Sequence, residues 1–165
     1  MILTYLTRAI IARVKADTGT GGLYSASGGT AWNTSLIPGG IWAVRGNPDD
    51  ATMPFGVLTI TGEKSLSMSS DGMKFRFTFD IVGAESTDPS VLSSVVDRLH
   101  GNAVLANPPV PTYGFMRHKL ILATNDYTAI CSECIVESTS LGVSDVHANM
   151  ASVTYSVECF TREAS

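Results

Sequence analysis

The alternation of apolar and polar residues is sharpest over residues 74–85. Every second position there is apolar, namely Phe75, Phe77, Phe79 and Ile81. Successive side chains of a strand point to opposite faces, so this pattern predicts a strand with one buried and one wet face. Three phenylalanines on one face indicate that this strand forms the floor of the core.

The period changes after this strand. Between residues 89 and 100 the apolar positions recur at helical spacing, at Val91, Leu92, Val95, Val96 and Leu99. Thr87 or Asp88 can cap this helix, Pro89 suits its first turn and Gly101 suits its end. A partly charged His100 imidazole would be favourable at the helix C-terminus. We expect the helix to lie across the apolar face of the sheet.

The remaining strands are predicted from alternation and from the turn residues that bound them. They cover residues 41–44, 55–68, 115–123, 129–138 and 147–161, with turns at 69–72 and 140–145. The first of these turns should return the strand 55–68 as the Phe-rich strand in an antiparallel hairpin. The last strand places one set of residues on its apolar face, namely Ala151, Val153, Tyr155, Val157 and Cys159.

The N-terminal segment predicts an amphipathic helix over residues 3–15. Its apolar stripe consists of Leu3, Leu6, Ile10 and Val14, and the basic residues lie mostly off this stripe. No apolar run approaches the roughly 20 residues of a membrane span, and the polar face carries few charges, so we expect no membrane partner.

The least regular part is the long Gly-rich loop 18–54. We expect Trp32 and Trp42 to anchor this loop on the body of the protein or on a neighbouring chain, since aromatic residues are enriched at interfaces. The elements together predict an α+β fold, a mainly antiparallel β-sheet with an N-terminal helix and a second helix packed against one face. We interpret residues 1–165 as a single domain.

Composition narrows the class of protein. Hydrophobic residues make up 44% of the chain and charged residues 16%, which excludes a disordered chain. The net charge of -4 argues against a general nucleic-acid binder, which needs a basic surface. The odd count of 3 cysteines favours a reducing compartment over a disulfide framework.

The sequence contains no recognisable catalytic motif. Cys131 and Cys134 have zinc-like spacing, but residues three apart in a continuous strand point to opposite faces, so buried structural thiols are favoured. His118 and His147 lie near no carboxylate in catalytic spacing, and neither a phosphate loop nor a nucleophile elbow occurs. We therefore expect no enzyme and no cofactor. A small metal- or ligand-binding domain built from these histidines and cysteines remains the third hypothesis.

The charges on the expected polar strand faces form two sets. The basic set is Lys74, Arg76, Arg117 and Lys119, and the acidic set is Glu133, Glu137 and Glu158. Cross-strand pairing within one sheet, at about 0.2–1 kcal/mol a pair, is the favoured interpretation. The alternative is a basic patch that meets an acidic patch on the next copy in a head-to-tail ring. These residues, with Trp32 and Trp42, are the candidate interface residues.

The order of these elements resembles a known family. The chain has an amphipathic helix 3–15, a long loop, a strand entered through Pro54-Phe55-Gly56-Val57, the Phe-rich strand, the helix of Val91, Val95 and Leu99, and a closing strand at 151–157. This pattern resembles the tail-terminator (tail-completion) proteins of long-tailed bacteriophages.

The resemblance implies a non-enzymatic hexameric ring that caps the tail tube, ends its growth and presents a surface for head joining. The implied partners are other copies of the chain, the tail tube protein and a head-tail connector or head-closure protein. DNA would pass through the ring without sequence-specific contacts. The implied location is the tail-neck region of the virion, and the host cytoplasm during assembly. The runner-up is another neck component, such as a head-closure or tail-tube-type ring protein.

Overall fold

The computed structural model describes residues 2–17, 22–24, 36–43, 52–64, 72–84, 86–101, 114–116, 118–123, 127–143 and 149–163. Two helices and seven strands lie within these ranges. In chain order they are α1 (Ile2–Lys15), β1 (Ile41–Ala43), β2 (Phe55–Lys64), β3 (Gly72–Val82), α2 (Pro89–His100), β4 (Lys119–Ala123), β5 (Tyr127–Glu133), β6 (Ile135–Val143) and β7 (Asn149–Glu163).

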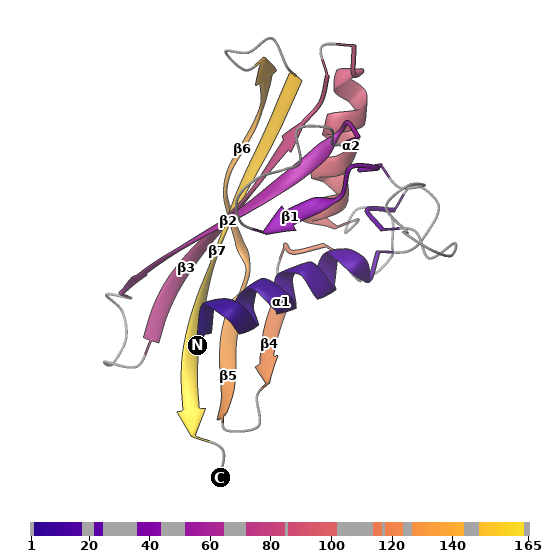
Figure 1. Cartoon of the computed structure of the whole chain (residues 1–165). Helices are drawn as coiled ribbons and strands as arrows, with labels where there is room; N and C mark the ends of the chain where they lie inside the picture. Colours follow the sequence, from indigo (N-terminus) through magenta and orange to yellow (C-terminus); the bar gives the residue numbers. More distant parts are fainter. Residues whose placement is uncertain are drawn as a thin grey trace, which may run out of the picture.

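The strands form one curled sheet in the order β1-β2-β3-β7-β5-β4, and β6 also pairs with β7. Strands β5 and β6 follow one another along the same edge of β7. Only the short β1 runs parallel to its neighbour, and the other strand pairs are antiparallel. Both helices lie on one side of the sheet (Figure 1). The predicted α+β fold, with a mainly antiparallel sheet and two helices on one face, is confirmed.

The core lies between the sheet and the helices. The residues of the Phe-rich stripe on β3 are fully buried, and the predicted apolar face of β7 is buried beside them. From α1 the core receives Leu6, Ile10 and Val14, and from α2 it receives Leu92, Val95 and Leu99. Leu3 was expected to join this stripe but is 42% exposed, because the buried part of α1 begins only at Leu6.

The ends of α2 show why the helix stops where it does. Asp88 is the N-cap, since its side chain accepts a 2.9 Å hydrogen bond from the Ser90 N–H. Gly101 follows the helix with a φ of 97°, which favours glycine. The carbonyl of Leu99 accepts a hydrogen bond from the Phe115 N–H at 2.8 Å. Because the segment around Phe115 caps this helix end, the strand predicted at 115–123 begins only at Lys119.

The strand predicted at 129–138 is wrong in its continuity. The structure breaks it at Cys134, whose N–H donates a 2.9 Å hydrogen bond to the His118 carbonyl. Beyond the break, β6 continues to Val143, so residues 140–143 form a strand where a turn was predicted. An irregularity between Val136 and Ser138 leaves Glu137 as an extra residue in β6.

A buried ion pair joins the end of α1 to α2. Both carboxylate oxygens of Asp17 accept hydrogen bonds from the Arg98 guanidinium, each at 2.7 Å. The Leu23 N–H donates to the same carboxylate at 3.0 Å. Asp17 is only 3% exposed, so this contact ties the two helices together inside the protein.

Candidate interaction surfaces

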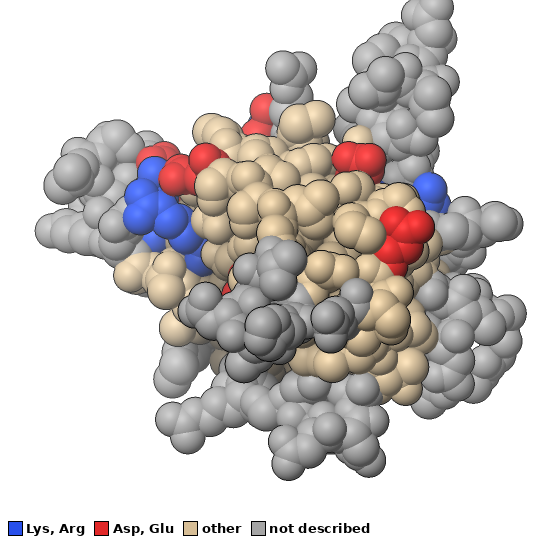
Figure 2. Space-filling model, turned by 90° about the horizontal axis from the view of Figure 1, so that it is seen from above, with Lys and Arg blue, Asp and Glu red and all other residues tan. Residues whose placement is uncertain are grey.

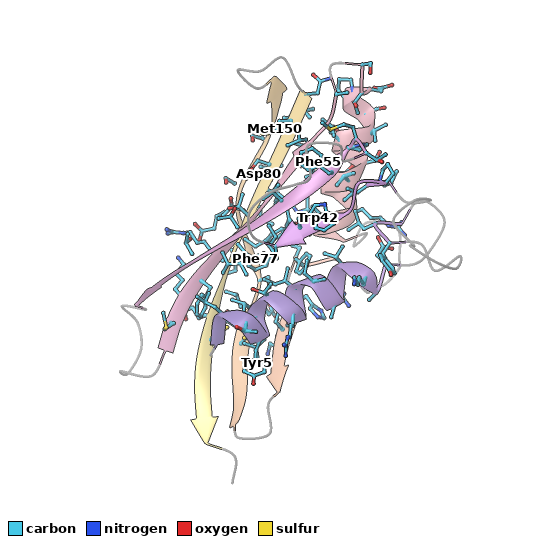
Figure 3. The ribbon with its side chains drawn as sticks, viewed as in Figure 1. Tyr5, Trp42, Phe55, Phe77, Asp80 and Met150 are labelled. Atoms are coloured by element: carbon cyan, nitrogen blue, oxygen red, sulfur yellow. The ribbon has the colours of Figure 1, made fainter. Side chains whose placement is uncertain are left out.

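The sheet face away from the helices is polar, and no described helix covers it. The Ser152 hydroxyl donates to the Asp80 carboxylate at 2.8 Å, and the hydroxyls of Thr78 and Thr154 are also 2.8 Å apart. Figure 3 shows Asp80 on this open side of the sheet, whereas Phe77 lies between the sheet and α1. These cross-strand contacts join β3 to β7 on the open face.

Three of the candidate interface residues form one charge cluster on this face. The Lys74 Nζ lies 3.3 Å from Glu137 Oε1, and the Arg76 Nε lies 3.3 Å from Glu137 Oε2. A hydrogen bond from Ser156 lowers the pKa of the Glu137 carboxyl, and the two cations add to this effect. The extra residue in β6 therefore directs Glu137 across β7 towards β3. Pairing within one sheet, the favoured interpretation, is confirmed for these residues.

The other candidates are placed as follows. Glu158 on β7 lies directly opposite Lys74 on β3. Lys119 on β4 lies directly opposite Glu133 on β5, and these two side chains are exposed. Figure 2 shows basic side chains touching acidic ones at the left of the view. Trp42 is 43% exposed, and its indole N–H donates to the Gly39 carbonyl at 2.9 Å.

Trp32 and Arg117 lie outside the described residues. For each of the candidates, contact with a neighbouring copy stays a prediction. The structure brings Lys74, Arg76 and Glu137 into one cluster, while Trp42 lies on the edge strand β1.

The three cysteines are buried, as expected for structural thiols, but the opposite orientation expected for Cys131 and Cys134 is wrong. The break at Cys134 turns both Cys131 and Cys134 inward, with exposed fractions of 4% and 1%, so they do not point to opposite faces. Cys159 lies directly opposite Cys131 on β7. Among the described residues, no group of three or more His, Cys, Asp or Glu side chains could hold a metal ion. His147 lies outside that part of the chain.

These thiols should resist modification in the folded protein. Burial, with the negative charge of a Cys131 thiolate, raises the pKa of Cys134 to about 12. At pH 8 only about one Cys134 in 10,000 would be the reactive thiolate. A hydrogen bond from the Cys159 thiol lowers the pKa of Cys131. We expect a thiol reagent to leave Cys134 unlabelled in the native state and to label all three cysteines in urea.

The control for this labelling is Cys131→Ser, which removes the thiol with the lowered pKa. Any slow labelling of the native protein should disappear in this variant. Rapid labelling of Cys134 in the native protein, detected by mass spectrometry of peptides, would contradict its burial.

The imidazole of His100 is not the partly charged group that was expected at the C-terminus of α2. Its Nδ1 lies 2.7 Å from the Tyr155 hydroxyl, and burial lowers the pKa of the imidazole. The unfolded chain, with an ordinary pKa near 6.5, therefore binds more protons than the folded protein as the pH falls. The contribution of neutral His100 to the free energy of unfolding is fully present above about pH 6.5. It is lost as the pH falls towards the pKa of His100 in the folded protein.

The expected result is a urea midpoint that decreases from pH 7 to pH 5.5. His100→Gln should flatten this dependence, and His118→Gln should flatten it further, because burial also lowers the pKa of His118. An unchanged slope in both variants would show that other groups cause it. The pKa of the Glu137 carboxyl is also lowered, but its protonation reduces the stability only below about pH 4.5. Its effect can therefore be distinguished from that of the histidines.

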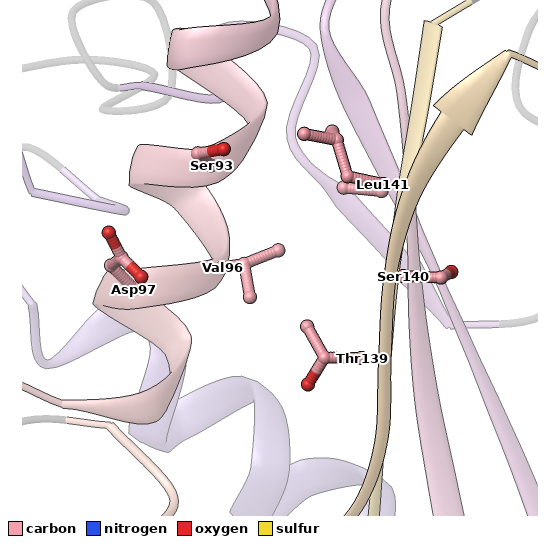
Figure 4. Close-up of a pocket in the computed structure, with 7 residues that line it drawn as sticks. Ser93, Val96, Asp97, Thr139, Ser140 and Leu141 are labelled. Carbon is pink, nitrogen blue, oxygen red and sulfur yellow. The ribbon is translucent and has the colours of Figure 1, made fainter.

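A shallow groove separates α2 from β6. It has a volume of about 150 Å³ and is lined by Ser93, Val96, Asp97, Thr139, Ser140, Leu141 and Ala151. Val96, Thr139 and Leu141 point into it, whereas Ser140 points away from the helix (Figure 4). The groove was not predicted, because a turn was expected at residues 140–145, where β6 continues to Val143. The alternation of Thr139, Leu141 and Val143 with small polar residues is the pattern that could have revealed it.

Comparisons with known proteins identify no family. No family model matches the chain, and no curated protein sequence matches it. Neither helix in the described ranges is both long enough and apolar enough to cross a membrane.

Proposed function

We propose that this chain is a structural virion protein that forms a ring on the phage tail tube, ends tail growth and supplies the surface for head joining. The observation that carries the proposal is the order of the elements on one sheet. An N-terminal helix, the β2–β3 hairpin, α2 and the closing strand β7 follow one another as in the family that the sequence resembles. The number of six subunits comes from that resemblance alone.

The surface of the described residues is consistent with assembly through protein contacts. One sheet face is packed against both helices, while the opposite face is polar and carries the charge cluster of Lys74, Arg76 and Glu137. Large apolar side chains are exposed at Trp42, Ile135 and Leu141, on strands at the margins of the sheet. They lie at two different margins of the sheet, where neighbouring copies in a ring would meet.

The test is to remove this chain from the phage that encodes it and to image the tails by electron microscopy. We expect tails that exceed their normal length and do not join heads. Supplying the wild-type chain from a plasmid should restore both properties. Tails of normal length that join heads would refute the proposal, and tails of normal length without heads would favour a head-closure role.

A further inference from the structure

The sheet has two long strand edges to which no described strand is paired. On β2, the short β1 covers only Gly56, Val57 and Leu58, which leaves the edge from Thr59 to Lys64 open within the described part of the chain. On the far side of β7, the outer edge of β6 faces no strand among the described residues. Unpaired edges of this kind can pair with another chain.

The hydrogen bonds of β1 show which peptide groups of β2 face outward. The Gly56 N–H donates to the Gly40 carbonyl at 2.9 Å, so the polar groups of Gly56 point away from β3. The direction of these groups alternates along a strand. The N–H and C=O groups of Ile60 and Gly62 therefore also point outward, beyond the reach of β1.

The same reasoning applies to β6 through its neighbour β7. The Asn149 carbonyl accepts from Gly83 on the β3 side, and the Glu158 N–H donates to Ser132 on the β5 side. The even-numbered residues of β7 thus bond towards β5 and β6. The N–H and C=O groups of their partners on β6, Ser138 and Ser140, therefore point towards β7. The N–H and C=O groups of Thr139 and Leu141 point away from β7.

We propose that these two edges join between copies, so that the outer edge of β2 in one subunit adds to the outer edge of β6 in the next. The interface rests on the ring of the proposed function and supplies its subunit contact. The sheet then continues from subunit to subunit through main-chain hydrogen bonds, centred on Ile60 and Gly62 of one copy and Thr139 and Leu141 of its neighbour.

The faces and directions of the two edges match. Ile60 and Gly62 pair with Phe77 and Phe75 on the helix-covered face, and Leu141 pairs with the buried Ala151 on that same face. The pairs β2–β3, β3–β7 and β7–β6 are all antiparallel, so the strand direction reverses three times between β2 and β6. These two strands therefore run in opposite directions. A neighbour in the same orientation thus forms an antiparallel ladder, with helices on the same side.

The edge of β6 lacks the features that usually block strand addition. It has nine residues, with neither Pro nor Lys, and its one charge, Glu137, is held by Lys74 and Arg76. The edge strand β4 has only five residues and carries Lys119. An added strand would also cover Leu141, which is 52% exposed, and would lie over the groove beside Val96.

A symmetric β6–β6 pair is the competing arrangement. It would give hydrogen-bond partners to the outward N–H and C=O groups of Thr139 and Leu141, but it would leave the edge of β2 unpaired in both copies. It would also bring the Asp97 side chains of both α2 helices to the same groove region, where like charges repel. Head-to-tail joining uses both edges and, as a heterologous contact, can close into a ring.

Cross-linking of the purified chain tests the interface. Thr61 and Ser140 are exposed, and the three native cysteines are buried. With a short bis-maleimide, the double variant Thr61→Cys and Ser140→Cys should give a series of oligomers, and each single variant should remain monomeric on denaturing gels. A dimer from Ser140→Cys alone would establish the symmetric pair and overturn the proposal. So would the absence of cross-links in the double variant.

Thr139→Pro provides an independent measurement. Proline at this position removes an outward N–H and no hydrogen bond to β7, so the variant should keep the circular dichroism spectrum of the parent. We expect native mass spectrometry to show at least a tenfold loss of the ring. Thr139→Val keeps the N–H and should assemble as the parent does.

The outcomes separate the interface from the function. A folded Thr139→Pro chain that still forms the ring would overturn the interface and leave the proposed function standing. Normal tails in the phage without this chain would refute the function, whereas cross-linking would still decide the interface.

Discussion

Phe77→Ala is expected to lower the free energy of unfolding by about 3–5 kcal/mol, as is typical for a buried aromatic residue. Phe77 is fully buried at the centre of an aromatic cluster. Its ring lies 5.3 Å from Tyr155, 5.4 Å from Phe115 and 5.9 Å from Phe79, measured between ring centroids. The substitution removes these contacts and leaves a cavity between the sheet and the helices. Urea denaturation should show a midpoint lowered by roughly 2 M.

The control for this substitution is Leu3→Ala on α1. Leu3 is also a large apolar residue but is 42% exposed, so its loss should change the stability by less than about 0.5 kcal/mol. A Phe77→Ala variant that unfolds at the same urea concentration as the parent would mean that the register of β3 is wrong.

Asp17→Asn is expected to destabilise the protein by about 3 kcal/mol, because it leaves the Arg98 cation without its buried partner. The carboxylate of Asp17 holds the guanidinium through bonds of 2.7 Å and also accepts the Leu23 N–H. Arg98 keeps partial access to water, with a side-chain exposure of 21%, which places the cost at the lower end of the range for buried pairs. Urea denaturation measures the effect.

The matched control is a double-mutant cycle with Arg98→Met. Replacing both members of a buried ion pair costs less than removing one of them, since no unpaired charge remains. The double variant Asp17→Asn and Arg98→Met should therefore be more stable than Asp17→Asn alone. Additive losses in the cycle would show that the two side chains do not interact, contrary to the geometry.

Periodicity was sufficient to predict the elements that bury one clear face. The Phe-rich stripe of β3, the apolar face of β7 and the helical spacing of α2 each extend over enough residues to define both the element and its buried side. The capping pattern around Asp88 set the start of α2 for the same local reason.

The elements that the sequence placed wrongly depend on contacts with distant residues. The strand expected from Phe115 is delayed to Lys119, since the N–H of Phe115 is bonded to the end of α2. The break at Cys134 follows from its bond to His118. Neither partner can be read from the local pattern, because each is brought into reach only by the folded chain.

For the candidate surface, alternation along the chain was sufficient to place Lys74 and Arg76 on the polar face of β3, opposite the buried phenylalanines. The contact of Glu137 with Lys74 and Arg76 across β7 could not be predicted in this way, since it depends on an extra residue in β6 that appears only when the strands pair. Nor could alternation predict that the outer edges of β2 and β6 face no strand among the described residues, because strand order is a property of long-range pairing.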